Sequence, residues 1–223
     1  MNELVRIEGE AGPVACYVAQ PAGVGEGTPG VLVLHAWWGL TEHFKRVCDR
    51  LASHGYVALA PDFFRGETAE TPERAKELAQ GAPDADCSAI MEAALNRLKE
   101  LAPGKTGVVG FSFGSYLAVW IASKRPGDVD AVVPFYTDTD ADVVAIPTPM
   151  QWHFAEKDDF VPNEWVEELR LKLTESGRDD VETHVYPGTE HAFFNVSRPE
   201  AYKKEAAELA WERMLGFFET HLR

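Results

Sequence analysis

Basic residues, cysteine and long apolar runs are all scarce in this 223-residue sequence. Lysine and arginine number 21 against 36 aspartate and glutamate residues, which gives a formal net charge of −15. Nucleic-acid and anionic-membrane partners are bound through clustered lysine and arginine. The acidic excess therefore argues against both partners, and we interpret it as a source of solubility.

The three cysteines, Cys16, Cys48 and Cys87, have no CxxC or zinc-type spacing, which predicts free thiols in a reducing compartment. The first residues lack the apolar stretch of a secretory signal, and no apolar run approaches the ~20 residues of a membrane span. We therefore expect a cytoplasmic protein. Segment 138–142 resembles the start of a calcium loop, but Val143 and Pro149 occupy its glycine and glutamate positions, so it is not an EF-hand. The sequence has no HExxH or other metal-ligand cluster, and we expect neither metal nor cofactor.

From residue 31 onward, apolar runs alternate with segments of helical periodicity. We predict strands at 31–34, 56–60, 106–111, 131–135, 150–155 and 181–186, and helices at 41–53, 72–80, 85–101, 113–122, 163–176 and 199–222. Strands this apolar are covered on both faces, which predicts a mostly parallel sheet between two helical layers. The segment before residue 30 lacks a helix and is expected to add one or two antiparallel strands at the sheet edge. We expect one domain over 1–223, without a large cap.

The sequence Gly110-Phe111-Ser112-Phe113-Gly114 matches G-x-S-x-G between a predicted strand and a predicted helix. In this setting the chain turns so sharply that side chains at the two glycines would collide with neighbouring backbone. The turn exposes the serine oxygen above the sheet, near a helix N-terminus. The pattern therefore predicts that Ser112 is a nucleophile.

A serine nucleophile needs a base, and the base needs an orienting carboxylate. His191 follows the last predicted strand, at the sheet edge where ligands bind in such folds. Glu156, Asp158 and Asp159 follow the preceding strand, and the residues alone do not separate Asp158 from Asp159. The chain order of serine, acid and histidine is that of α/β-hydrolases.

Two backbone N–H groups should stabilise the oxyanion of the tetrahedral intermediate. One is that of Phe113, directly after the nucleophile, and our candidate for the other is Trp37 in the loop after strand 31–34. Aromatic and imidazole side chains in the loops at this edge are expected to line the pocket, with His35, Trp38, Phe64 and Phe193 as the candidates.

The sequence resembles the dienelactone hydrolase family of α/β-hydrolases over nearly its whole length. The matching stretches are 60–62, 110–114, 158–162 and 187–193. The resemblance implies an α/β-hydrolase fold, and it assigns the acid to Asp158, the base to His191 and the oxyanion donors to Phe113 and Trp37.

The sequence departs from the best-known members of that family at three positions. They have a cysteine nucleophile where this chain has Ser112, a thiol-modulating glutamate where it has Ala36, and a carboxylate-binding arginine where it has Asn195. The departures favour an uncharged ester or lactone as substrate. The net charge of −15 also disfavours an anionic substrate, unless a local arginine such as Arg65 or Arg74 compensates.

We therefore predict a serine hydrolase that cleaves small carboxylic esters or lactones through an acyl-enzyme. Two alternatives use the same fold: an acyltransferase or peptidase with the same triad, and a catalytically silent binding module. The sequence leaves open whether the protein is a monomer or a homodimer.

Overall fold

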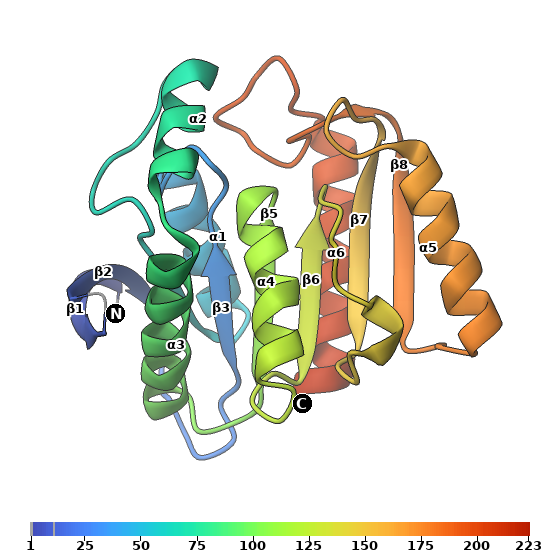
Figure 1. The fold of residues 1–223 in the computed structure, drawn as a ribbon. Coiled ribbons are helices and arrows are strands. Elements are labelled where there is room, and N and C mark those ends of the chain that lie inside the picture. Colours follow the sequence, from blue (N-terminus) through green and yellow to red (C-terminus); the bar gives the residue numbers. More distant parts are fainter. Residues whose placement is uncertain (1, 11) are drawn as a thin grey trace.

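Buried apolar strands form the centre of the molecule, because helices cover both of their faces. The computed structural model describes residues 2–10 and 12–223 and contains a sheet with the strand order β1-β2-β4-β3-β5-β6-β7-β8 (Figure 1). The strands are β1 (Asn2–Gly9), β2 (Gly12–Ala19), β3 (Gly30–Leu34), β4 (Val57–Pro61), β5 (Thr106–Phe111), β6 (Ala131–Phe135), β7 (Met150–Lys157) and β8 (Val181–Glu190).

The strands from β3 to β8 run parallel, whereas β1 and β2 pair antiparallel at one edge. This arrangement confirms the predicted α/β architecture and the antiparallel N-terminal addition. The connecting helices are α1 (Glu42–Ser53), α2 (Pro72–Gly81), α3 (Asp84–Leu101), α4 (Phe113–Lys124), the 3₁₀ turn η1 (Val143–Ala145), α5 (Asn163–Ser176) and α6 (Lys204–Leu222).

Helices α1 and α6 lie together on one face of the sheet, and α3 and α4 lie on the other (Figure 1). Arg50 of α1 and Glu208 of α6 form an ion pair across the first layer. On β7, Trp152 and Phe154 pack against Trp165 of α5. Together the layers bury a continuous apolar core along the central strands.

The last helix begins later than the sequence predicts. We expected helix from residue 199, but α6 starts at Lys204. Residues 191–203 instead make successive turns, in which the side chain of Asn195 accepts the N–H of Ser197 and the N–H of Lys203 returns to the carbonyl of Phe193. Because of these turns, the segment forms a loop at the edge of the sheet where the parallel strands have their carboxyl ends (Figure 1).

The strand order reverses at β3, which has β4 on one side and β5 on the other. In open parallel sheets, ligands bind beyond the carboxyl ends of the strands at such a switch point. The loops that follow β3 and β5 therefore frame the expected site. Between β4 and β5 the chain contains only loop 62–71 and helices α2 and α3 with their short connections, so no cap domain is inserted there.

All three cysteines are buried and free, as the sequence predicts. Burial raises the pKa of Cys16 to about 12 and that of Cys87 to about 11, so these thiols are poor nucleophiles near neutral pH. Within residues 2–10 and 12–223, no helix combines the length and the hydropathy that crossing a bilayer requires. The cytoplasmic location stays a prediction.

Candidate active site

Ser112 lies at a strained turn between β5 and α4. Its backbone has φ = 52° and ψ = −115°, which is unusual for a residue with a side chain. Strain of this kind is concentrated at functional sites. The turn places the Ser112 hydroxyl beyond the carboxyl end of the sheet and directly before the first turn of α4.

The two glycines of the turn are required by close packing. A Cβ atom on Gly110 would lie 2.6 Å from the carbonyl carbon of Gly114, and one on Gly114 would lie 2.6 Å from the carbonyl carbon of Leu34. Neither distance is compatible with a side chain. The local reason for the G-x-S-x-G pattern is therefore the approach of α4 to β5 and β3.

Ser115 fastens the turn to the neighbouring strand β6. Its buried hydroxyl donates to the carbonyl of Phe135 and accepts the N–H of the same residue, both at 2.9 Å. The N–H of Ser112 donates to the Phe135 carbonyl as well, at 3.0 Å. These bonds hold the backbone of Ser112 against the sheet.

Ser112, His191 and Asp158 form a continuous chain of polar contacts, although they come from three separate loops. The Ser112 Oγ lies 2.9 Å from His191 Nε2, and His191 Nδ1 lies 2.9 Å from each carboxylate oxygen of Asp158. Because a carboxylate only accepts, Nδ1 carries the proton and Nε2 presents its lone pair to the serine hydroxyl. This is the arrangement that a general base requires.

The structure separates the two neighbouring carboxylates that the sequence leaves equivalent. The side chain of Asp158 is only 2 % exposed, and its Oδ1 accepts the N–H groups of Phe160 and Val161. Asp159 is exposed and lines a cavity instead. The turn after β7 therefore directs Asp158 alone toward His191.

Two aromatic rings enclose the imidazole of His191. The ring centroid of Tyr136 lies 4.9 Å from it, and that of Phe160 lies 4.6 Å from it. Tyr136 is buried and its backbone also has a positive φ, 40°. These contacts restrict the rotation of the imidazole and hold Nε2 toward Ser112.

The backbone N–H groups of Trp37 and Phe113 have no hydrogen-bond acceptor within the part of the chain that the structure describes. Phe113 begins α4, where the first N–H groups have no partner within the helix. Trp37 lies in the loop after β3 and lines the same cavity as His191. Both donors are free to bind an oxyanion.

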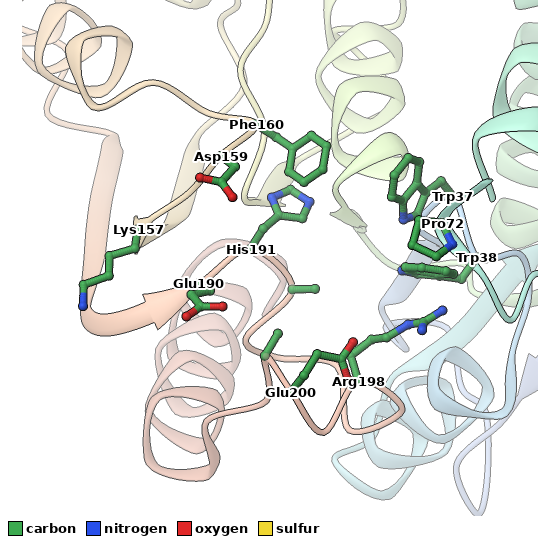
Figure 2. A pocket seen from close by; sticks show the side chains of 12 residues that line it. Trp37, Trp38, Pro72, Lys157, Asp159, Phe160, Glu190, His191, Arg198 and Glu200 are labelled. Atoms are coloured by element: carbon green, nitrogen blue, oxygen red, sulfur yellow. The ribbon is translucent and has the colours of Figure 1, made fainter. Parts of the chain in front are cut away.

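A cavity of about 600 Å³ opens beside His191 (Figure 2). Aromatic and proline side chains form one part of its lining, and charged side chains form the other. The lining includes Trp37, Trp38, Pro72, Lys157, Asp159, Phe160, Glu190, Arg198 and Glu200. The cavity thus offers an apolar wall for a ligand beside His191.

The similarity to known proteins extends over the whole of this architecture. Residues 14–222 match the dienelactone hydrolase family. The chain is 38% identical to "Protein usf" of Aquifex pyrophilus and 36% identical to "Putative carboxymethylenebutenolidase" of Aquifex aeolicus, with full coverage of both sequences in each case.

The chain belongs to the dienelactone hydrolase family. Its resemblance to that family is thereby confirmed, and it is a hydrolase with the α/β-hydrolase fold. A solved dienelactone hydrolase-like promiscuous phosphotriesterase from metagenomic libraries superposes with a TM-score of 0.84 at 20% identity, covering 100% of this chain and 99% of that one. At that identity the likeness concerns the fold.

In this dienelactone hydrolase family member, three of the residues expected in the pocket lie elsewhere. His35 and Phe193 are fully buried and do not line the cavity. At Ala192 the backbone has φ = 67°, and Phe193 beyond it packs in the core against Tyr186. Phe64 is also buried and borders a second hollow of about 280 Å³. Of the four expected lining residues, only Trp38 lines the cavity beside His191.

Arg65 and Arg74 border that second hollow as well, and neither lines the cavity beside His191. Arg65 pairs with Asp86, and Arg74 pairs with Glu67 and Glu77. Their charges are therefore balanced locally, outside the lining of the cavity beside His191.

The structure adds Arg198, which no sequence pattern singled out. Its guanidinium carbon lies 3.1 Å from the ring centroid of Trp38, and the side chain lines the cavity (Figure 2). Burial lowers the pKa of Arg198, while the negative charge of Glu200 opposes that shift. An arginine seven residues after His191 has no sequence signal of its own, because it reaches the cavity only through the fold of loop 191–203.

Proposed function

We propose that this protein is a serine hydrolase that cleaves small, uncharged carboxylic esters or lactones through an acyl-enzyme. The observation that carries the proposal is the chain of contacts from Ser112 through His191 to Asp158, with Ser112 at a strained turn. Membership of a hydrolase family supports it.

In the proposed acylation step, Ser112 Oγ attacks the carbonyl carbon of the ester while His191 Nε2 takes the hydroxyl proton. The carbonyl oxygen becomes an oxyanion, which the N–H groups of Trp37 and Phe113 bind. Asp158 accepts the Nδ1–H of His191 and stabilises the imidazolium. The imidazolium then gives its proton to the leaving alkoxide, and the acyl-enzyme remains.

Deacylation repeats these steps with water as the nucleophile. His191 removes a proton from a water molecule, and the resulting hydroxide attacks the acyl carbon. Collapse of the second tetrahedral intermediate breaks the bond to Ser112 Oγ, which recovers its proton from His191. With a lactone, the alcohol and the acid leave as one molecule.

The cavity supports a small and neutral substrate. Its charged lining consists of two basic residues, Lys157 and Arg198, and three acidic residues, Asp159, Glu190 and Glu200. This excess of acidic groups does not favour an anionic ligand. The volume of about 600 Å³ and the absence of an inserted cap between β4 and β5 fit short acyl groups better than long lipid chains.

The test is hydrolysis of 4-nitrophenyl acetate, butyrate and octanoate by the wild-type protein and by Ser112→Ala. We expect activity on the short esters that Ser112→Ala lacks. Ser123→Ala is the matched control, because Ser123 lies at the far end of α4 and only bonds the carbonyl of Trp120. We expect it to behave as wild type.

Labelling by a fluorophosphonate probe distinguishes a narrow substrate range from a silent site. We expect labelling of the wild type and of Ser123→Ala, with none in Ser112→Ala. Turnover in Ser112→Ala equal to wild type would contradict the nucleophile. A folded wild-type protein that neither turns over esters nor reacts with the probe would support the binding-module alternative.

A further inference from the structure

His35 lies behind the proposed oxyanion hole and not in the cavity. Its side chain is fully buried among the rings of Phe44, Phe63 and Phe64, with centroids 5.0 to 6.2 Å away. A polar ring placed this deep is costly unless its nitrogens are bonded. Both ring nitrogens of His35 have a hydrogen-bond partner in the backbone, Nε2 with Phe63 and Nδ1 with Ala36.

The two hydrogen bonds define the tautomer of His35. The N–H of Phe63 is a donor and lies 3.1 Å from Nε2, so Nε2 must accept. The carbonyl of Ala36 is an acceptor and lies 2.7 Å from Nδ1, so Nδ1 must donate. Burial lowers the pKa of His35 to about 4, against smaller opposing effects of the Ala36 carbonyl and of Asp62. The ring is therefore neutral near pH 7 and protonated on Nδ1.

The carbonyl of Ala36 and the N–H of Trp37 belong to one planar peptide unit and point in opposite directions. His35 Nδ1 and the N–H of Gly39, at 3.1 Å, both donate to that carbonyl. Fixing the carbonyl on one side aims the Trp37 N–H to the other side, where the described chain offers it no acceptor. Donation to the carbonyl also polarises the peptide and strengthens its N–H as a donor.

The support for His35 is itself rigid. Asp62 follows β4, is buried, and accepts the N–H groups of Phe64 and Gly66. These bonds hold the turn that carries the Phe63 N–H toward His35. A chain of hydrogen bonds thus runs from the end of β4 through the imidazole to the peptide after β3.

We propose that His35 is a positioning residue that orients and polarises the Ala36–Trp37 peptide for oxyanion binding. The inference rests on the proposed function, since it assigns that peptide to the oxyanion hole. His35 touches no substrate and acts only through the Trp37 N–H.

Two amide substitutions separate the donor role of the ring from its acceptor role. His35→Asn places an amide N–H near the position of Nδ1 and keeps the bond to the Ala36 carbonyl. His35→Gln places an amide oxygen near the position of Nε2 and keeps the bond to the Phe63 N–H. Each variant loses one of two buried hydrogen bonds, so both should unfold at lower urea concentration than wild type.

The kinetic effects should differ between the two variants. Loss of one oxyanion donor costs ~10²–10³ in kcat, and loss of its support should cost less, about tenfold. We expect His35→Gln to lose about tenfold in kcat on 4-nitrophenyl butyrate, with KM within about twofold, as for an interaction made only in the transition state. His35→Asn should stay within about threefold in kcat. A purely structural role would lower stability in both variants and leave both kcat values unchanged.

The inference is overturned if His35→Gln keeps full kcat, or if His35→Asn loses as much as His35→Gln. If neither variant folds, the inference is tested by the tautomer of His35 in the wild-type protein, which the ¹⁵N chemical shifts of its assigned imidazole nitrogens report. Protonation on Nδ1 supports the inference and protonation on Nε2 overturns it. Ester hydrolysis that survives Ser112→Ala would instead refute the serine mechanism and this inference with it. Full kcat in His35→Gln, with Ser112→Ala inactive, would refute this inference alone.

Discussion

Replacement of Asp158 by asparagine tests the proposed triad most sharply. Each carboxylate oxygen of Asp158 lies 2.9 Å from His191 Nδ1 and can only accept. In Asp158→Asn, the amide N–H can turn toward Nδ1, so that Nδ1 accepts and the ring proton moves to Nε2. With a proton on Nε2, the imidazole has no lone pair facing Ser112 and cannot accept the hydroxyl proton.

The size of this effect follows from the change of tautomer and from the loss of charge stabilisation for the imidazolium. We expect kcat to fall by ~10⁴, which corresponds to about 5.5 kcal/mol in activation free energy. The fold should persist, because the amide oxygen of asparagine can still accept the N–H groups of Phe160 and Val161, as Asp158 Oδ1 does.

Asp159→Asn is the matched control, with the same change of charge one residue away. Asp159 is exposed and makes no hydrogen bond to His191, so kcat should stay within about threefold of wild type. The assay is initial-rate hydrolysis of 4-nitrophenyl butyrate, with urea unfolding of each variant measured in parallel. A kcat within tenfold of wild type for folded Asp158→Asn, or equal losses in the two variants, would refute the reasoning.

Three further predictions concern packing, pH and substrate charge. Gly114→Ala should lower the free energy of unfolding by about 1–3 kcal/mol or prevent folding, since its Cβ would overlap a β3 carbonyl, whereas Gly127→Ala has open space and should unfold like wild type in urea. Burial lowers the pKa of His35 and of His43 from 6.5 to about 4, with the charge of Arg46 assisting at His43. The unfolded chain therefore binds more protons between pH 6.5 and 4, so stability should decrease as the pH is lowered from 6.5 to 4. His43→Phe should make this fall in urea midpoint shallower, and an unchanged pH dependence would contradict the assignment. Finally, kcat/KM should be several-fold higher for 4-nitrophenyl butyrate than for the anionic mono-4-nitrophenyl ester of succinate. Added salt should narrow this difference in kcat/KM. Preference for the anionic ester would contradict this prediction and show that the positive charge of Arg198 outweighs the acidic groups of the lining.

The order of strands and helices could be predicted from the sequence because it depends on local patterns. Apolar runs such as 31–34 and 131–135 have no polar face, so they require cover on both sides, and the sheet confirms this. The N-terminal segment lacks helical periodicity, and β1 and β2 form the antiparallel edge. The start of the last helix was wrong by five residues, because side-chain and backbone bonds within 191–203 hold that segment in turns.

The sequence also indicated which loops carry the candidate catalytic residues. The G-x-S-x-G pattern predicts its own turn, because side chains at the two glycines would collide with neighbouring backbone there. His191 could be placed because it follows a strand, and the carboxyl ends of parallel strands share one edge of the sheet. The family resemblance then selected Asp158, although its spacing alone did not.

Side-chain direction in the loops depended on the tertiary structure. Asp158 and Asp159 are neighbours, and only the hydrogen bonds of the turn after β7 direct the first toward His191. Phe193 enters the core because the backbone turns at Ala192, and Arg198 reaches the cavity because its loop folds back over Trp38. A strand or helix repeats its geometry from residue to residue, so its sequence predicts it. A loop side chain points where contacts from distant segments direct it, and those contacts exist only once the chain has folded.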